Sequence, residues 1–406
     1  MNVATPVGSK GEPDLRYNKL YGELGSGPIS TRPYISPEFF EKEKQQLFRK
    51  AWLGVCRVEE VANPGDYRVI DLASIDASVI IIRGRDKVLR AFHNACPHRC
   101  NKILQPGSGK DKRAIMCNFH GWTFDLTGKL VDCPAQELFV DFDPSKRGLV
   151  PISLGVWEGF VFVSREPDRS LEEWLGPIKD RYGGYFERFK LAGHFSTTLH
   201  ANWKIIVDAN NEAYHAPVLH RVNLRDAAAG KDNPNARFNS VRLYDMHCEM
   251  TLWGNPDYRP TAVEGLGFRY AERPLWPAMG TVDDILPPGI NPDRDPLWIF
   301  DLMIVFPTFN LLMARDYYLW VQYWPEAVDQ TRIELMTFLE PAKTAGDVFA
   351  QEYMLTHMHD TQREDWSTVE GTHQMMLTGA IKELQLNDEE VIIRHNQRVL
   401  RDFVGE

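Results

Sequence analysis

The sequence lacks any long hydrophobic run. Its most apolar stretches, VWEGFVFV at Val156–Val163 and DLMIVF at Asp301–Phe306, are far shorter than the roughly 20 residues of a membrane-spanning helix. The N-terminal residues 1–27 contain no apolar core of the kind that signal peptides carry. We therefore expect no membrane association and a cytosolic location.

Basic clusters and dinucleotide-binding motifs are also missing. The formal net charge is −10, and Lys and Arg are scattered, whereas a nucleic-acid-binding protein needs a basic face. No GxGxxG motif follows a strand pattern and opens a helix. Nucleic acid is therefore not an expected partner, and NAD(P)H would have to be bound by another protein.

Cysteine is scarce, and its distribution is uneven. Six cysteines occur among 406 residues, at positions 56, 96, 100, 117, 133 and 248. In a large chain without an export signal a disulfide framework is not expected, because the cytosol keeps thiols reduced. The grouping of Cys96, Cys100 and Cys117 instead favours metal binding or catalysis.

The length of the chain exceeds what one hydrophobic core usually supports, so two domains are expected. Residues 1–45 are predicted to form an arm that leads into a helix, with Ser36 as N-cap and Pro37 in its first turn. Residues 46–165 contain short runs rich in Val, Ile and aromatic residues, separated by turn signals such as PGD and LTGK. This pattern predicts a small all-β domain.

Residues 166–406 mix helical and strand patterns, so the expected fold class is α+β. Helical spacing continues through NWKIIVDANNEAYHAPVLHR, residues 202–221. Residues 296–342 indicate three successive strands, with turns near Pro307 and at EAVDQT. Long helices are predicted to close the chain, from about Thr344 to Phe403.

Two pairs of metal-ligand residues lie within the β region. Cys96-x-His98 is followed, after eighteen residues, by Cys117-x-x-His120. Two Cys and two His can hold a structural zinc ion, although zinc sites usually use CxxC pairs. One thiolate and one imidazole per pair also suit a two-iron two-sulfur cluster, in which neutral imidazoles raise the reduction potential to roughly −150 to +300 mV.

The stretches CPHRC and CNFHGWTFDLTG resemble the Rieske motif as it occurs in Rieske non-heme iron oxygenases. The resemblance implies that Cys96, His98, Cys117 and His120 bind the 2Fe-2S cluster. Cys100, two residues past His98, is left as a bystander thiol. An electron carrier that holds only this cluster is the main alternative to an oxygenase.

A second group of ligand residues follows. His215 and His220 lie five positions apart, so a helix with a local distortion can aim both imidazoles at one point. With one carboxylate they would form the facial triad of non-heme Fe(II) oxygenases. The stretch from NWK to His220 also resembles the catalytic-domain signature of Rieske oxygenases. That resemblance implies a third ligand on a late helix, where Asp365 is the predicted choice and Glu364 the reserve.

The same resemblance assigns an electron bridge to the acid three residues before the first His ligand. Here it is Glu212, where many members have Asp, and it would link His215 to a cluster histidine of a neighbouring subunit. Asp208, one turn earlier, is expected to support the site or the structure around it.

Taken over the chain, the resemblance implies the catalytic alpha subunit of a Rieske oxygenase. It would combine an all-β Rieske 2Fe-2S domain (46–165) with a mononuclear iron domain (166–406), in which helices cover an antiparallel sheet. The expected reaction is O2-dependent hydroxylation of an aromatic or other apolar substrate, by mono- or dioxygenation. N- or O-dealkylation is the alternative. Within the resemblance, Glu212 in place of Asp favours monooxygenation or dealkylation over ring dioxygenation.

The resemblance also implies partners. A ferredoxin, an NAD(P)H-dependent reductase or both would supply electrons, and the bridge implies a ring of subunits, with a homotrimer the simplest closure. The resemblance also allows a small beta subunit in the assembly. The substrate is expected to meet apolar side chains from DMHCEMTLWG, LMIVFPTFNLLM and HQMML.

Overall fold

The computed structural model describes residues 15–224, 226–269 and 286–405, and the chain divides into two compact units. One unit is the continuous segment Lys44–Trp174. The other combines the residues up to Glu43 with those from Leu175 onward. The N-terminal helix predicted from Ser36 is present as α3, Pro37–Glu43, and continues as a π-helical segment, Lys44–Phe48.

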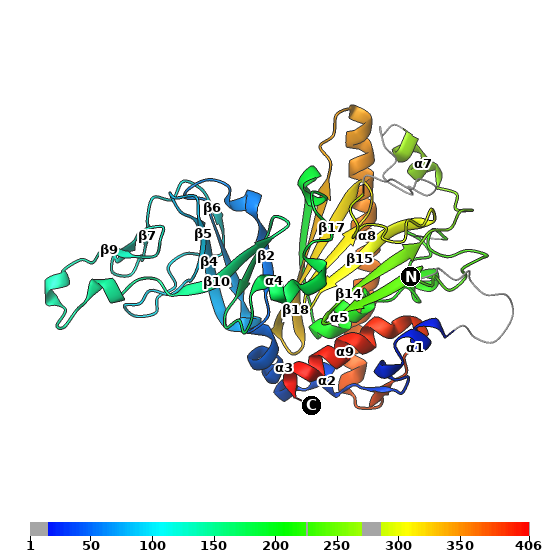
Figure 1. Ribbon diagram of the computed structural model, residues 1–406, viewed down its shortest axis with the longest axis horizontal. Helices are drawn as coiled ribbons and strands as arrows, with labels where there is room; N and C mark the ends of the chain where they lie inside the picture. The colour runs from blue at the N-terminus through cyan, green and yellow to red at the C-terminus, as the bar shows by residue number, and fades with distance from the viewer. Residues whose placement is uncertain (1–14, 225, 270–285, 406) are drawn as a thin grey trace. The chain divides into compact units, whose positions relative to one another are not determined.

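The unit Lys44–Trp174 is built from β-structure (Figure 1). A seven-stranded antiparallel sheet has the order β2-β11-β10-β5-β4-β3-β6. Its strands are β2 Leu53–Arg57, β3 Tyr67–Leu72, β4 Ala77–Arg83, β5 Leu89–His93, β6 Gly107–Gly109, β10 Pro151–Trp157 and β11 Phe160–Ser164. A smaller sheet contains β7 Ile115–Met116, β8 Thr123–Phe124 and β9 Leu130–Asp132. The prediction of an all-β module is confirmed.

The core of this unit reaches the two loops that carry the Cys and His pairs. Ile80 and Ile82 of β4 pack in one cluster with Trp122 and Phe124, and the side chains of Cys96 and Cys117 belong to the same buried cluster. The first pair follows β5, and the second lies between β7 and β8. Both thiols are therefore held from within the hydrophobic core, which fixes the loop tips.

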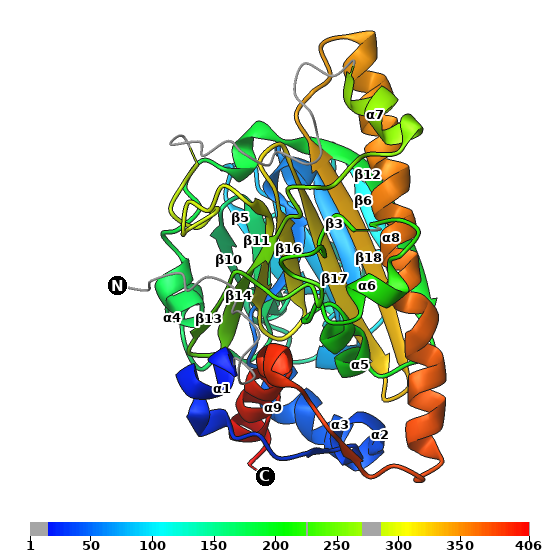
Figure 2. The same cartoon turned by 90° about the vertical axis from the view of Figure 1, so that its right-hand side faces the viewer.

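The second unit contains another seven-stranded antiparallel sheet, in the order β12-β18-β17-β16-β15-β14-β13 (Figure 2). Its strands are β12 Lys190–Leu199, β13 Ser240–Tyr244, β14 His247–Trp253, β15 Trp298–Val305, β16 Phe309–Met313, β17 Tyr317–Ala327 and β18 Gln330–Leu339. The prediction of three strands over 296–342 was wrong, because four are present. The missed turn, Ala314–Asp316, contains neither Gly nor Pro and is closed by Ala314 N–H donating to the Tyr317 carbonyl.

Helices α5, α8 and α9 pack against this sheet. The helices of the unit are α1 Arg16–Leu20, α2 Arg32–Ile35, α3, α5 Trp203–Ala209, α6 Ala216–Leu219, α7 Ala262–Arg269, α8 Ala345–Leu377 and α9 Val391–Val404, while α4 Leu171–Leu175 spans the boundary between the units. The long helix α8 runs beside the sheet and contacts β12 and α5 (Figure 2). Thr344 and Asp347 form a capping box at its start. The α+β prediction is confirmed, and none of the described helices is long and apolar enough to cross a membrane.

The N-terminal segment is attached to the C-terminal part of the chain by backbone pairing. The strand β1, Ile29–Ser30, pairs antiparallel with β19, Glu383–Leu384. A buried ion pair attaches the N-terminal segment to α5 as well, because Lys204 Nζ lies 2.6 Å from Glu43 Oε1 of α3. Trp203 Nε1 donates to the other oxygen of Glu43 at 3.1 Å.

Replacing Lys204 by methionine is expected to destabilise the second unit by about 3 to 5 kcal/mol, because it leaves the buried Glu43 carboxylate uncompensated. The double variant Lys204→Met/Glu43→Leu removes both charges and is expected to regain most of that loss. Urea unfolding followed by tryptophan fluorescence measures both. A single variant as stable as the parent protein would show that the pair contributes nothing.

Candidate functional site

The two Cys/His loops of the β unit lie against each other. The rings of His98 and His120 have centroids 4.6 Å apart, and the thiols of Cys96 and Cys117 interact. Trp122 is stacked on His98 with a centroid distance of 4.9 Å and an interplanar angle of 7°. The four predicted cluster residues are thus paired by type, thiol with thiol and imidazole with imidazole.

The thiols and the imidazoles differ in their surroundings. Cys96 and Cys117 are buried, whereas His120 is exposed. Burial raises the pKa of Cys96 to about 11, and the neighbouring Cys117 thiol adds to the rise. For Cys117 burial also acts upwards, but the N–H of Phe119 and the Asn101 amide lower its pKa overall. A bound metal would hold both sulfurs as thiolates, since coordination removes the thiol proton.

The arrangement fits a two-iron cluster better than one zinc ion. A single ion would gather its ligand atoms, yet among the described residues no three of these four offer ligand atoms within 4.8 Å of one another. Nδ1 of His98 is buried and has no hydrogen-bond partner in the described part of the chain. A nitrogen in that state suits a metal bond, and the pairing by type suits two thiolates on one iron and two imidazoles on the other.

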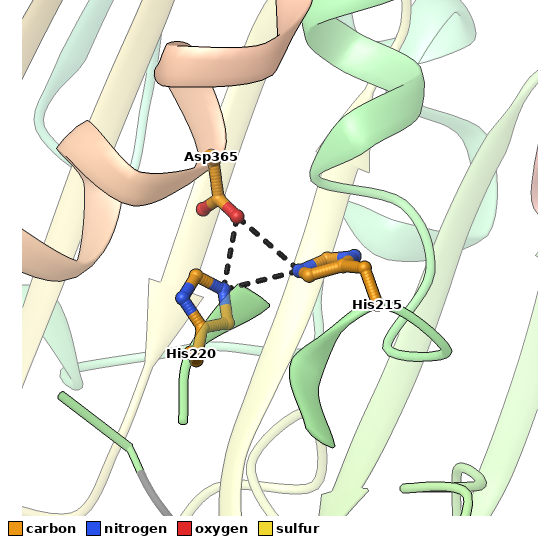
Figure 3. A group of neighbouring side chains, drawn as sticks. All are labelled: His215, His220 and Asp365. Atoms are coloured by element: carbon orange, nitrogen blue, oxygen red, sulfur yellow. Dashed lines mark hydrogen bonds and ion pairs between the residues drawn. The ribbon is translucent and has the colours of Figure 1, made fainter. Parts of the chain in front are cut away.

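The second site brings together His215, His220 and Asp365 (Figure 3). Oδ1 of Asp365 lies 2.9 Å from Nε2 of His220 and 3.2 Å from Nε2 of His215. The two Nε2 atoms are 3.1 Å apart. Three different ligand atoms thus face one point, which is the arrangement of a facial triad.

The histidines are not carried on one distorted helix, as the spacing had suggested. Helix α5 ends at Ala209, and His215 and His220 flank the four-residue helix α6, with Pro217 in its first turn. The break falls at two asparagines, which favour turns over helix interiors, and the Asn210 amide donates back to the Ile206 carbonyl at 3.0 Å. The short helix therefore presents both imidazoles from its ends.

Each histidine also contacts a carboxylate through its other ring nitrogen. Glu364 Oε2 lies 2.9 Å from Nδ1 of His220. Glu212 contacts Nδ1 of His215 through Oε1 and accepts the backbone N–H of His215 at Oε2, at 3.1 Å. Such contacts fix the tautomer that leaves Nε2 free for a metal. Glu364, the reserve candidate for the third ligand, therefore orients His220, while Asp365 lies at the meeting point.

The electrostatics of this site favour a cation. Burial would lower the pKa of His215, but Asp365 and Glu212 raise it to about 10. Burial would raise the pKa of Asp365, yet its contacts with His215 and His220 lower it. Three carboxylates around two imidazoles create a strongly negative field, which a divalent metal ion would neutralise without protonating the histidines.

The three residues also line an open cavity with about 640 Å³ of empty space, a volume that includes open solvent. Its described wall is mainly apolar: Ala209, Ala213, Ala216, Leu224, Ala228, Phe238, Leu252, Phe300, Leu302, Leu312 and Met358. The described polar part of the wall consists of Asn210, Glu212, His215, His220, Thr361, Gln362 and Asp365. Of the stretches expected to meet substrate, two contribute through Leu252, Leu302 and Leu312, while HQMML is absent from the described wall.

Two further residues singled out in the sequence, Asp208 and Cys100, lie outside the described cavity wall. Asp208 accepts a hydrogen bond from Tyr34 Oη at 2.6 Å and does not line the cavity wall described above. None of the six cysteines forms a disulfide, and Cys100 is exposed.

Comparison with protein families matches both units. Residues 51–143 match the Rieske [2Fe-2S] domain, and residues 186–406 match the ring-hydroxylating alpha subunit (catalytic domain). The chain belongs to the ring-hydroxylating alpha subunits. Its cofactors are therefore a Rieske 2Fe-2S cluster and a mononuclear iron, and the resemblance seen in the sequence is confirmed.

Curated relatives of this alpha subunit act on different compounds. The carnitine monooxygenase oxygenase subunit of Escherichia coli (strain K12) is 40% identical over 196 residues, which cover 47% of this chain and 52% of the relative. The 2-aminobenzenesulfonate 2,3-dioxygenase subunit alpha of Alcaligenes sp is 33% identical over 287 residues, which cover 69% of this chain and 66% of the relative. The alignment with the first of these relatives spans only about half of its length.

Solved structures share the fold of this alpha subunit over nearly its whole length. A quaternary ammonium Rieske monooxygenase has a TM-score of 0.75 and 24% identity, with 94% of this chain and 97% of that chain covered. Naphthalene 1,2-dioxygenase from Rhodococcus sp. has a TM-score of 0.72 and 18% identity, with 97% of this chain and 98% of that chain covered. At these identities the likeness establishes the fold alone.

The sequence reasoning missed two contacts at the catalytic site. It did not predict that Glu364 contacts His220. Adjacent residues on a helix point in different directions, so Glu364 can reach His220 Nδ1 while Asp365 faces the metal site. It also missed Gln362, whose Nε2 lies 3.4 Å from Oδ2 of Asp365. The i, i+3 spacing on one helix face was the available signal for this second contact.

Proposed function

We propose that this chain is the oxygenase component of an enzyme that hydroxylates a neutral, largely apolar organic substrate with O2. The observation that carries the proposal is the convergence of His215, His220 and Asp365 at the wall of a mainly apolar cavity. In the proposal these residues hold the mononuclear iron, and Cys96, His98, Cys117 and His120 hold the cluster. When bound, the cluster supplies single electrons and the iron supplies O2 activation.

The residues of this chain then have separate tasks. Glu212 and Glu364 hold the imidazole rings so that both Nε2 atoms face the metal. The apolar wall positions the substrate and excludes water. Glu212 also serves as the link to a cluster histidine of a neighbouring subunit.

The partners follow from the same proposal. A separate ferredoxin or NAD(P)H-dependent reductase delivers electrons, and a head-to-tail ring, with a homotrimer as its simplest form, places each cluster beside the next catalytic unit. The related quaternary ammonium monooxygenase structure is described in terms of inter-subunit electron transfer, which supports the ring. A cytosolic location belongs to this proposal as well.

Reconstitution tests the function. Purified protein with a surrogate reductase, NADH and a panel of neutral aromatic compounds is expected to consume O2 and to release a hydroxylated product. Reduced protein should give a Rieske electron paramagnetic resonance signal, with about one further iron per chain. Zinc as the only metal would overturn the proposal, and a cluster without O2 consumption would indicate an electron carrier.

A dealkylating monooxygenase is the second candidate. The carnitine monooxygenase and glycine betaine monooxygenase oxygenase subunits among the relatives favour it. Removal of a methyl group releases formaldehyde, whereas ring hydroxylation releases a phenol or a cis-diol. Product identification therefore separates the two reactions.

L-Carnitine is expected to be turned over at least about 100-fold less efficiently than the best neutral aromatic compound. No Lys or Arg belongs to the described cavity wall, so the carboxylate of carnitine would be buried without a counterion. The aromatic residues of the described wall are Phe238 and Phe300, and Trp, the strongest cation–π partner for a trimethylammonium group, is not among them. Oxygen uptake measures the two efficiencies, and comparable values would contradict the proposed substrate class.

A further inference from the structure

One polar atom of the described cavity wall, Oε1 of Gln362, is buried, has no hydrogen bond and is not part of the proposed iron site. Gln362 is 9% exposed, lies on α8 one turn before Asp365 and lines the cavity. Its Oε1 is buried and accepts no hydrogen bond from any residue that the structure describes. A buried carbonyl oxygen without a partner is unfavourable, so a partner is expected in the working complex.

The orientation of this amide follows from its neighbour. Nε2 of Gln362 lies 3.4 Å from Oδ2 of Asp365. An ionised carboxylate only accepts hydrogen bonds, so the NH2 group must face Asp365 and the carbonyl oxygen must point elsewhere. The free group is therefore an acceptor.

The neighbouring polar groups of the wall are already engaged. Thr361 Oγ1 donates to the His357 carbonyl at 2.8 Å, and Asn210 Nδ2 donates to the Ile206 carbonyl at 3.0 Å. Glu212 uses both oxygens on His215. Among the described wall residues, the buried side-chain oxygens without a hydrogen bond are Oε1 of Gln362 and Oδ1 of Asp365, and the second belongs to the metal site.

We infer that Gln362 determines substrate specificity by accepting a hydrogen bond from an N–H or O–H group of the substrate. This inference rests on the proposed function and narrows its substrate class to neutral, mainly apolar molecules that carry one donor. Because Gln362 is also bonded to the ligand Asp365, the donor of the substrate is held on the side of the cavity where the iron binds. The remaining apolar wall accommodates the rest of the molecule.

Equilibrium binding tests the inference without relying on turnover. Three bicyclic probes of nearly equal shape are used under argon with the metal-loaded protein: indole carries a donor, benzofuran an acceptor only, and indene neither. Calorimetry is expected to give indole at least about tenfold tighter binding than benzofuran or indene, because only indole pairs with the amide oxygen. Equal affinities for indole and indene would overturn the inference.

A matched pair of variants assigns the effect to this residue. Gln362→Met keeps the length of the side chain and removes the acceptor. The variant is therefore expected to bind indole no more tightly than benzofuran or indene. Gln374→Met, the same change at an exposed position of α8, is expected to keep the indole preference. A Gln362→Met protein that retains both its iron and the full preference would overturn the assignment. If that variant loses iron, the three-probe comparison on the unaltered protein decides.

The failure of the inference is distinguishable from the failure of the proposed function. A protein that contains iron and consumes O2 but does not prefer indole contradicts only the role of Gln362. A protein that prefers indole but consumes no O2 with any compound contradicts the oxygenase proposal and leaves the amide contact standing.

Discussion

Replacing Asp365 by alanine is expected to remove the mononuclear iron and product formation while leaving the Rieske cluster intact. Oδ1 of Asp365 lies 2.9 and 3.2 Å from the Nε2 atoms of the two histidines, so it is the proposed anionic ligand. Two neutral imidazoles alone bind iron weakly, and we expect the mononuclear iron content to fall by more than about tenfold. Metal analysis together with the electron paramagnetic resonance signal of the cluster measures both parts of this prediction.

The residue one position earlier provides a control. Glu364→Ala removes the carboxylate that contacts Nδ1 of His220 but leaves all three proposed ligands in place. Its iron affinity is expected to weaken by about 10- to 100-fold, so the variant should refill at high iron concentration, whereas Asp365→Ala should not. If Glu364→Ala stays empty and Asp365→Ala keeps its iron, the roles assigned to the two acids are reversed.

The sequence was sufficient to predict that Cys96, His98, Cys117 and His120 lie together, because these residues occupy two short loops. Each Cys/His pair occupies one loop, so spacing and residue type together specify which side chains meet. Iron–sulfur chemistry restricts the choice further, since one thiolate and one imidazole per loop allow pairing by type. The stacking of Trp122 on His98 depends on how two loops pack, which the spacing of the ligands does not determine.

The mononuclear site depends on a contact between distant segments. His215 and His220 are neighbours in the chain, but Asp365 lies on α8, and composition alone gives no reason to choose it over the other acids of that helix. The resemblance to a family supplied the pair Glu364 and Asp365, and the geometry of α8 separated their contacts. The residues of a cavity wall are harder still to predict from sequence. Leu252, Leu302 and Leu312 line the cavity because of the register in which their strands pair, and that register is not written in any local motif.

The two wrong predictions about secondary structure have local causes. The helical spacing of residues 202–221 was real, but Asn210 and Asn211 interrupt the helix, and side-chain competition for backbone groups explains the break. The turn between β16 and β17 was missed because Ala314–Asp316 contains neither Gly nor Pro, and Asp316 alone was too weak a turn signal. In the first case the error concerned the very segment that presents the histidines, so the interruption is part of the site.

Replacing Glu212 by glutamine is expected to separate metal binding from catalysis. In the structure both oxygens of Glu212 are used on His215, one on the ring nitrogen and one on the backbone N–H. Glutamine has the same length and keeps one acceptor, so iron content should stay near that of the parent protein. The negative charge is lost, and with it the proposed link between His215 and a cluster histidine of a neighbouring subunit.

The rate of product formation is therefore expected to fall by about 10- to 100-fold in Glu212→Gln, with both metal signals retained. Glu212→Asp keeps the charge on a shorter side chain and should retain more of the rate. Rapid-mixing experiments that follow cluster oxidation after substrate and O2 are added locate the defect, because slow cluster oxidation places it before the chemistry. Parent-like turnover in Glu212→Gln would rule out the bridge, and loss of iron would show that Glu212 acts mainly by holding His215.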